Sequence, residues 1–168
     1  MKKLSLLFVL FIGLLISCNK DEEGDSLEVA VKIGAQAPEF EMVDESGTSF
    51  HLSDFRGKYV VVDFWAAWCG ICRTENPKMQ ALSIAYKDKN VQFIGACIDA
   101  NTNNWKEAII EDGLTYLQLH DELAFNSEVV KTYGIGSVPF MMLVDENGKI
   151  LTFTSRVADI EERLNKEF

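Results

Sequence analysis

Two cysteines stand at the point where a strand pattern gives way to a helical pattern. The strand pattern covers residues 59–64, which are aromatic or β-branched apart from one acid, Asp63. Cys69 and Cys72 follow at Cys-x-x-Cys spacing, and apolar residues then recur at helical spacing over residues 75–87. This order predicts a buried strand that leads into an amphipathic helix, with the cysteines at the helix start. The chain is therefore constrained to an α/β fold.

The position of Cys69 at the helix start predicts redox chemistry. Unpaired N–H groups and the positive end of the helix dipole stabilise a thiolate, so the pKa of Cys69 should be depressed and its sulfur nucleophilic near neutral pH. Cys72, one turn further on, should be the more buried thiol and the one that resolves a mixed disulfide. Pro77 falls inside the predicted helix, where it removes a hydrogen bond and should bend the axis.

A Cys-x-x-Cys pair is also half of a zinc site, which needs four ligands. The remaining soft donors are Cys18, Cys97, His51 and His120, and no two of them form a second closely spaced pair. We therefore predict no metal site and no cofactor. Cys97 lies in an apolar run and is expected to be a buried, inert thiol. Both histidines are expected in surface loops, and Trp105 in a purely structural role.

The composition sets the domain count and argues against one class of partner. With 168 residues and 48% hydrophobic content, the chain has material for one ordinary core. The formal net charge of -10 makes nucleic acid a poor partner.

Residues 1–17 have the pattern of an export signal. A basic start is followed by an apolar run from Leu4 to Ile16, which is too short to span a bilayer comfortably. The segment ending at Cys18 resembles the lipobox of bacterial lipoproteins, which implies cleavage before Cys18 and diacylation of its sulfur. An ordinary signal peptide or anchor with an incidental cysteine is the alternative.

Residues 18–32 form the predicted tether, which we expect to be disordered and lipid-anchored because 19–26 are polar and acidic. Lys20 followed by acids also resembles export signals of surface lipoproteins in some Gram-negative bacteria, with a plain spacer as the simpler interpretation. We therefore place the protein in the cell envelope, held at a bacterial membrane by lipid and facing the periplasm or the surface.

Residues 33–168 have the composition of one globular domain. Their patterns predict, in chain order, a short hairpin before residue 58, a strand at 59–64, a helix at 75–87, a strand at 91–98, a helix at 101–112, a strand at 114–119, a helix at 123–133, a hairpin of strands 140–144 and 150–154, and a closing helix at 157–168. Alternating strands and helices followed by an antiparallel pair predict a mixed central sheet flanked by helices.

The cysteine segment resembles the active-site segment of the thioredoxin superfamily. The resemblance rests on residues 62–73 and on a second signature at 133–140 that contains Val138 and Pro139. It implies a thioredoxin fold with a redox-active Cys69–Cys72 disulfide. It also implies that the Val138–Pro139 peptide bond is cis and faces the disulfide.

Further motifs narrow the resemblance to the TlpA-like and ResA-like branch, whose members are membrane-tethered thiol-disulfide oxidoreductases related to AhpC/TSA proteins. These motifs are Gly-x-x-Ala-Pro-x-Phe at 34–40, the tripeptide at 56–58, and an inserted strand-helix element between 101 and 133. Partners in this branch include oxidised envelope proteins, among them apocytochrome c in cytochrome c maturation, and a membrane thiol donor. We expect similar partners here, and a monomer.

Two acids match positions that the superfamily uses. Asp63 matches the buried acid behind the resolving cysteine, and Glu75 matches a Glu that the branch carries beside the active site. Burial raises the pKa of a carboxyl, so such an acid is able to take the proton of Cys72 as that thiol attacks a mixed disulfide. The alternative for Glu75 is an exposed acid that interacts with the dipole of its helix.

The residues around the motif are expected to shield the disulfide and form the surface on which partners dock. The docking residues are Trp65, Trp68, Gly70, Ile71 and Val138, with core packing as the alternative for the two tryptophans. Ile71 stands where thioredoxin has Pro, so the reduction potential stays open.

The leading hypothesis is thiol-disulfide exchange with partner proteins, with net reduction of their disulfides. A peroxiredoxin-like thiol peroxidase is an alternative because the N-terminal pattern is shared, but those enzymes place Thr three residues before the reactive Cys, where Ala66 stands. A second alternative is a surface lipoprotein whose thioredoxin-like domain only binds a partner, with the disulfide as a staple.

Overall fold

The computed structural model describes residues 28–168. The predicted signal peptide, the lipidation site Cys18 and most of the predicted tether lie outside these residues. In chain order the elements are β1 (Glu41–Val43), β2 (Ser49–His51), η1 (Leu52–Phe55), β3 (Tyr59–Trp65), α1 (Gly70–Ala85), β4 (Val91–Cys97), α2 (Thr102–Glu111), β5 (Leu117–His120), η2 (Ala124–Asn126), α3 (Glu128–Tyr133), β6 (Phe140–Val144), β7 (Ile150–Thr154) and α4 (Val157–Leu164). Within this part of the chain no helix has the length and apolar character needed to cross a bilayer.

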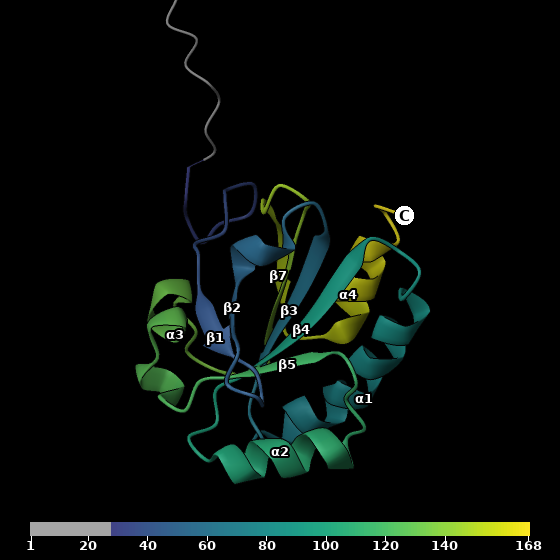
Figure 1. Ribbon diagram of the computed structural model, residues 1–168. Coiled ribbons are helices and arrows are strands. Elements are labelled where there is room, and N and C mark those ends of the chain that lie inside the picture. Colours follow the sequence, from purple (N-terminus) through teal and green to yellow (C-terminus); the bar gives the residue numbers. More distant parts are fainter. Residues whose placement is uncertain (1–27) are drawn as a thin grey trace, which may run out of the picture.

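The seven strands form one mixed sheet in the order β2-β1-β5-β4-β3-β6-β7. β4 is parallel to both β3 and β5, whereas β6 is antiparallel to β3. Helices cover both faces, with α1, α2 and α4 on one side of the sheet and α3 on the other (Figure 1). The prediction of a mixed sheet flanked by helices, with an N-terminal hairpin of β1 and β2, is confirmed.

The central strand β3 separates two buried clusters. Its alternate residues point to opposite faces of the sheet. Val61 packs with Met79 of α1 and with residues of α4, whereas Val60 and Phe64 belong to the larger cluster that includes α3. Asp63 follows Val61 on the same face, so the one acid of the strand points toward the side that α1 covers.

The folded part of the chain begins earlier than residue 33. Gln36 donates its N–H to the carbonyl of Glu28 at 2.9 Å, and the N–H of Ala30 donates to the carbonyl of Gln36 at 3.0 Å. The prediction that the tether extends to residue 32 is therefore wrong for its last five residues, 28–32, because they pair with the chain just ahead of β1.

The single helix predicted at 123–133 is also wrong. The structure has η2 and α3 instead, separated by Ser127, whose backbone is extended at ψ 143°. Ala124 adopts a positive φ of 51°, which an α-helix does not allow. The hydroxyl of Ser127 donates to Asp121 at 2.5 Å and holds the break in place.

His120 is buried at the end of β5 and does not lie in a surface loop, as the sequence predicted. Its ring stacks on Trp105 of α2 with centroids 4.6 Å apart, and its Nε2 lies 2.6 Å from the carbonyl oxygen of Asp99. His51, predicted in a loop, ends β2 and is half-buried. Aromatic stacking and a carbonyl partner explain why a histidine is retained inside the fold.

Candidate active site

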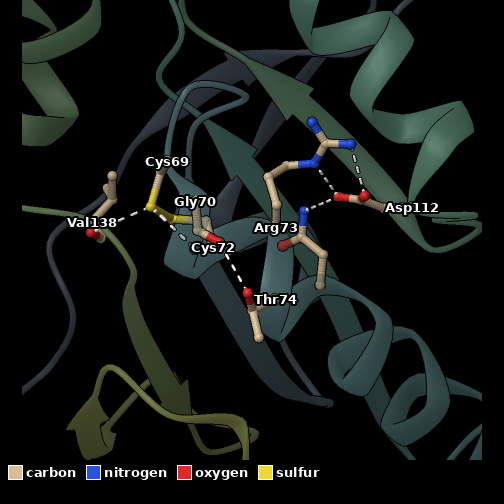
Figure 2. The surroundings of a disulfide bond; sticks show 8 residues. Cys69, Gly70, Cys72, Arg73, Thr74, Asp112 and Val138 are labelled. Carbon is tan, nitrogen blue, oxygen red and sulfur yellow. Dashed lines mark hydrogen bonds and ion pairs between the residues drawn. A yellow bond between two sulfur atoms is a disulfide. The ribbon is translucent and has the colours of Figure 1, made fainter.

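Cys69 and Cys72 form a disulfide at the N-terminus of α1 (Figure 2). Cys69 is the N-cap of the helix, and the N–H of Cys72 donates to its Sγ at 3.1 Å. Cys69 is 6% exposed and Cys72 1%, so Cys72 is the more buried of the two, as the sequence predicted. When the disulfide is reduced, the same N–H and the positive end of the helix dipole stabilise a thiolate on Cys69.

The loop before β6 brings a backbone carbonyl to the disulfide. The Sγ of Cys69 lies 3.5 Å from the carbonyl oxygen of Val138, and the Val138–Pro139 peptide bond is cis. Figure 2 shows Val138 beside Cys69, on the side away from α1. Two segments that are far apart in the sequence therefore meet at the sulfur atom of Cys69.

The first turns of α1 are fixed to the end of α2 by a charged cluster. Arg73 donates from Nε and Nη2 to the two carboxylate oxygens of Asp112, at 2.6 and 2.8 Å (Figure 2). Asn76 donates from Nδ2 to the same carboxylate at 2.8 Å. A bidentate pair of this kind sets the orientation of both partners. Sequence reasoning missed this contact because its partners are 39 residues apart and neither carries a local signal.

Asp63 lies beneath the first turns of α1. The helix runs back over β3, because it connects β3 to the parallel strand β4. Met79 packs on Val61, and Asp63 is about 6.6 Å further along the strand. An α-helix covers that distance in about four residues, which places Asp63 under the stretch from Cys72 to Asn76.

The carboxyl of Asp63 has no hydrogen-bond donor within residues 28–168, although it is only 1% exposed. Burial raises its pKa from 3.8 to about 7, with the charge of Glu75 as a second cause. Buried polar groups in folded proteins are nearly always hydrogen-bonded. An acid kept in this state is poised to gain or lose a proton near neutral pH.

Glu75 lies near Asp63 in a different environment. Its carboxylate accepts from the N–H of Val157 at 2.9 Å and from Lys78 at 2.5 Å, and so ties α1 to the start of α4. Burial works to raise the pKa of Glu75, but the hydrogen bonds from Lys78 and Val157 outweigh it and lower that pKa. Glu75 is therefore a partly buried, ionised neighbour of Asp63.

The predicted docking residues divide into two groups. Trp68 and Ile71 are 57% and 67% exposed, and Gly70 is exposed beside them. Trp65 is 0% exposed, so its prediction as a docking residue is wrong and the alternative, core packing, is correct for it. As the last residue of β3, on the face that α1 covers, its indole is part of the core.

An aromatic residue that the sequence reasoning missed lies beside Trp68. The ring of Phe125, in η2, is centred 6.2 Å from that of Trp68, and Phe125 is exposed, as is its neighbour Leu123. Large apolar side chains gathered on a surface often mark an interaction site. The sequence signal for this surface is the close spacing of two large apolar residues, Leu123 and Phe125. In the single helix that the sequence predicts at 123–133, they would be scattered exposed residues.

Cys97 is the free cysteine among the described residues, and it forms no part of the disulfide. Cys97 is fully buried at the end of β4, and burial raises the pKa of its thiol to about 12. In the described part of the chain no group of three or more His, Cys, Asp or Glu residues is placed to hold a metal ion.

The family follows from comparison with known proteins. The Redoxin family model matches residues 32–166. The chain belongs to the Redoxin family. Among curated Redoxin-like relatives, the thiol-disulfide oxidoreductase ResA of Bacillus cereus is 34% identical over 155 residues, which cover 90% of this chain and 88% of the relative. ResA of Geobacillus thermodenitrificans is 33% identical over 140 residues, which cover 82% of this chain and 79% of the relative.

Solved structures agree with this placement. The thioredoxin domain of a thiol-disulfide oxidoreductase from Bacteroides vulgatus matches with a TM-score of 0.75 and 36% identity, covering 80% of this chain and 96% of that one. A thiol:disulfide interchange protein from Bacteroides sp. matches with a TM-score of 0.73 and 36% identity, covering 80% and 89%. The predicted thioredoxin fold is confirmed. This Redoxin-family protein is a ResA-like thiol-disulfide oxidoreductase with a Cys69–Cys72 pair.

Proposed function

We propose that the protein reduces disulfides in partner proteins outside the cytoplasm, with Cys69 as nucleophile and Cys72 as resolving thiol. The observation that carries the proposal is the position of the Cys69 sulfur, which accepts the Cys72 N–H at the start of α1 and lies 3.5 Å from the Val138 carbonyl. A thiolate there is stabilised by the helix, and a substrate disulfide would meet it beside the Val138 carbonyl.

The reaction consists of two exchanges. The Cys69 thiolate attacks one sulfur of the substrate disulfide, so that a mixed disulfide forms and the other substrate sulfur leaves as a thiolate. Cys72 then gives its proton to the carboxylate of Asp63 and attacks the Cys69 sulfur. The second substrate sulfur leaves, the Cys69–Cys72 disulfide forms, and two electrons have passed to the substrate.

Asp63 suits the second exchange because of its protonation behaviour. A base works best when its pKa lies near the working pH, and the pKa of this carboxyl is about 7. Cys72 is a buried thiol in the first turn of α1, the part of the helix that lies over Asp63, so solvent bases have little access to it. Glu75, which stays ionised, contributes by its charge and by holding α1 against α4.

Partner proteins would dock on the exposed apolar residues beside the disulfide. This surface consists of Trp68, Gly70, Ile71 and Phe125, with the backbone of Val138 presented across the sulfur. Oxidised envelope proteins, apocytochrome c among them, are the partners that the resemblance implies. A membrane thiol donor would return the disulfide to the dithiol, and a lipid on Cys18 would hold the protein, as a monomer, at the membrane.

The test is to replace the resolving thiol in the full-length chain. Cys72→Ala should trap mixed disulfides between Cys69 and envelope proteins, visible as adducts on non-reducing gels after thiol alkylation and collapsed by dithiothreitol. The matched control is Cys69→Ala/Cys72→Ala, which should give none. If the single variant gives no more adducts than the double variant, Cys69 does not attack protein disulfides and the proposal fails.

The direction of the reaction is tested by the equilibrium reduction potential of the full-length protein in detergent. A value near about -270 mV or lower supports a reductase fed by a membrane donor. A value near about -120 mV would make the protein an oxidant of envelope thiols and would contradict net reduction.

A further inference from the structure

A buried amide lies over a glycine next to Asp63. In the sheet, Asp63 of β3 pairs with Gly95 of β4, and Gly95 pairs with Gln118 of β5. A Cβ added to Gly95 would lie 2.1 Å from Oε1 and 2.7 Å from Nε2 of Gln118. The Gln118 amide therefore occupies the space that a side chain at position 95 would take, and only glycine leaves this space free.

This arrangement places the amide on the same face of the sheet as Asp63. Paired residues on neighbouring strands point to the same face, and neighbouring strands lie about 4.8 Å apart. The amide, displaced from its own strand to a position above Gly95, is one strand spacing from the Cα of Asp63 and on the same side of the sheet. The pKa of Tyr116, which shares this face two residues before Gln118, is raised by burial and then by the charge of Asp63, while the side chain of Gln118 works to lower it, as expected if the three residues are neighbours.

The Tyr116 hydroxyl is the polar group that the Gln118 amide is near enough to affect, and the amide works to lower the pKa of that hydroxyl. Neither Oε1 nor Nε2 of Gln118 has a hydrogen-bond partner among residues 28–168, and the residue is only 8% exposed. The same holds for both carboxyl oxygens of Asp63. Two buried, unpartnered polar groups thus lie on one face of the sheet, on either side of a glycine.

The titratable groups around Asp63 include no cation. From α1 the carboxyl faces Cys72 and Glu75, from β4 the thiol of Cys97, and from β5 the hydroxyl of Tyr116. The neighbouring strand β6 presents Met141, which does not titrate. A negative charge on Asp63 therefore gains nothing from a nearby cation, and the neutral donors able to stabilise it from β5 are the amide of Gln118 and the hydroxyl of Tyr116.

We propose that Gln118, whose amide fills the space that Gly95 leaves free, is a positioning residue. It allows Asp63 to ionise and so to accept the proton of Cys72. The amide donates Nε2–H to the carboxylate and offers Oε1 to the protonated acid, because rotation about its last side-chain bond exchanges the two. The kinetic part of this inference rests on the proposed role of Asp63 in the second exchange. The electrostatic part concerns the carboxyl itself and is measured without substrate.

The experiment is a carboxyl ¹³C NMR titration of Asp63 in the oxidised full-length protein, in which Cys69 and Cys72 do not titrate. Asp63→Asn assigns the signal by removing it. Gln118→Leu should raise the midpoint by about one pH unit or more, because the ionised carboxyl loses its donor. The matched control is Gln92→Leu, since Gln92 is on β4 and its amide donates to the Phe93 carbonyl at 2.9 Å; its midpoint should be unchanged.

A second variant reaches the same amide without changing Gln118. Gly95→Ala adds a Cβ that forces the amide aside, and should raise the midpoint in the same direction. Gly136→Ala is its control, because a Cβ there meets no atom within 4 Å. Gln118→Met replaces the amide by an apolar chain of similar length if the Leu variant fails to fold.

The two outcomes separate cleanly. Midpoints for Gln118→Leu or Gln118→Met and for Gly95→Ala that match the parent within 0.2 pH unit, about the precision of such a titration, would show that Gln118 only fills space. Because the oxidised protein is titrated without substrate, this result would overturn the role of Gln118 while leaving the proposed reductase function untouched. Conversely, a raised midpoint together with absent Cys72→Ala adducts would retain the electrostatic role and reject the function.

Discussion

Asp63 and Glu75 are two acids close to one another on the inner side of α1, and the structure treats them in opposite ways. Glu75 accepts from the Val157 N–H and from Lys78, and these hydrogen bonds lower its pKa despite partial burial. Asp63 receives no hydrogen bond from the described residues, and burial raises its pKa to about 7. The pKa values of the two acids therefore differ because Glu75 has hydrogen-bond donors and Asp63 has none among the described residues, and not because of burial depth alone.

Asp63 on β3 and Glu75 on α1 have two different tasks at one place in the fold. Glu75 connects α1 to α4 and keeps its charge, which suits a structural tie. The carboxyl of Asp63 accepts no hydrogen bond from the described residues, which costs stability but leaves its proton exchangeable near neutral pH. Groups that violate the rule of satisfied burial are expected at functional sites.

The largest effect should come from Asp63→Asn on the pH dependence of stability. In the folded protein the pKa of Asp63 is about 7 against an ordinary 3.8. Between these values the folded state holds a proton that the unfolded state has lost, so this group makes stability fall as pH rises, by roughly 3 kcal/mol from pH 5 to pH 8. Denaturant unfolding of the oxidised protein should show this fall in the parent and not in Asp63→Asn.

The control for that prediction is an exposed acid. Asp88→Asn, in the turn after α1, should keep the parent slope of stability against pH. If the parent and Asp63→Asn lose stability equally between pH 5 and pH 8, the carboxyl does not titrate in this range and the contrast between the two acids disappears.

A smaller effect is expected from Glu75→Gln, which removes the charge but keeps an oxygen that accepts the Val157 N–H. Since the charge of Glu75 raises the pKa of Asp63, this variant should lower the Asp63 midpoint by about half a unit to one unit. Stability should change little, whereas Glu75→Ala should cost about 1 kcal/mol because the start of α4 loses its acceptor. A rise in the Asp63 midpoint in Glu75→Gln would contradict the electrostatic coupling of the two acids.

The smallest effect is predicted at Cys97. Its pKa is raised to about 12 mainly by burial, with Asp63 contributing only a minor part. Iodoacetamide at pH 8 should therefore modify Cys69 in the reduced protein and leave Cys97 unmodified, both in the parent and in Asp63→Asn. Mass spectrometry of the peptides reads this directly, and labelling of Cys97 in the variant would show that the substitution has opened the core.

Local sequence patterns are enough to predict the elements of the fold that depend on local chemistry. The strand at 59–64, the cysteines at the start of α1, the Asn101 cap of α2 and the hairpin of β6 and β7 all follow from periodicity, capping and turns. The interpretation of Asp63 as a buried acid also held, because an acid inside an apolar strand has few other places to go.

The features that the sequence does not predict depend on strand register and on contacts between distant segments. The place of Trp65 beside the motif predicts a docking role with core packing as the alternative, and the alternation of β3 selects the core. The Gln118 amide above Gly95 depends on strand register across three strands, which no single segment encodes. The positive φ of Ala124 broke a helix that propensity alone would have continued.

The most direct test of the account is the rate at which Cys72 attacks a mixed disulfide on Cys69. Stopped-flow reaction of the reduced protein with excess Ellman's reagent should give two releases of thionitrobenzoate, the second of which is first-order and independent of reagent concentration. In the parent this second rate should rise with an inflection near pH 7; in Asp63→Asn it should fall about 100-fold at that pH and lose the inflection. Equal second-phase rates in the parent and in Asp63→Asn would show that Asp63 does not receive the proton of Cys72.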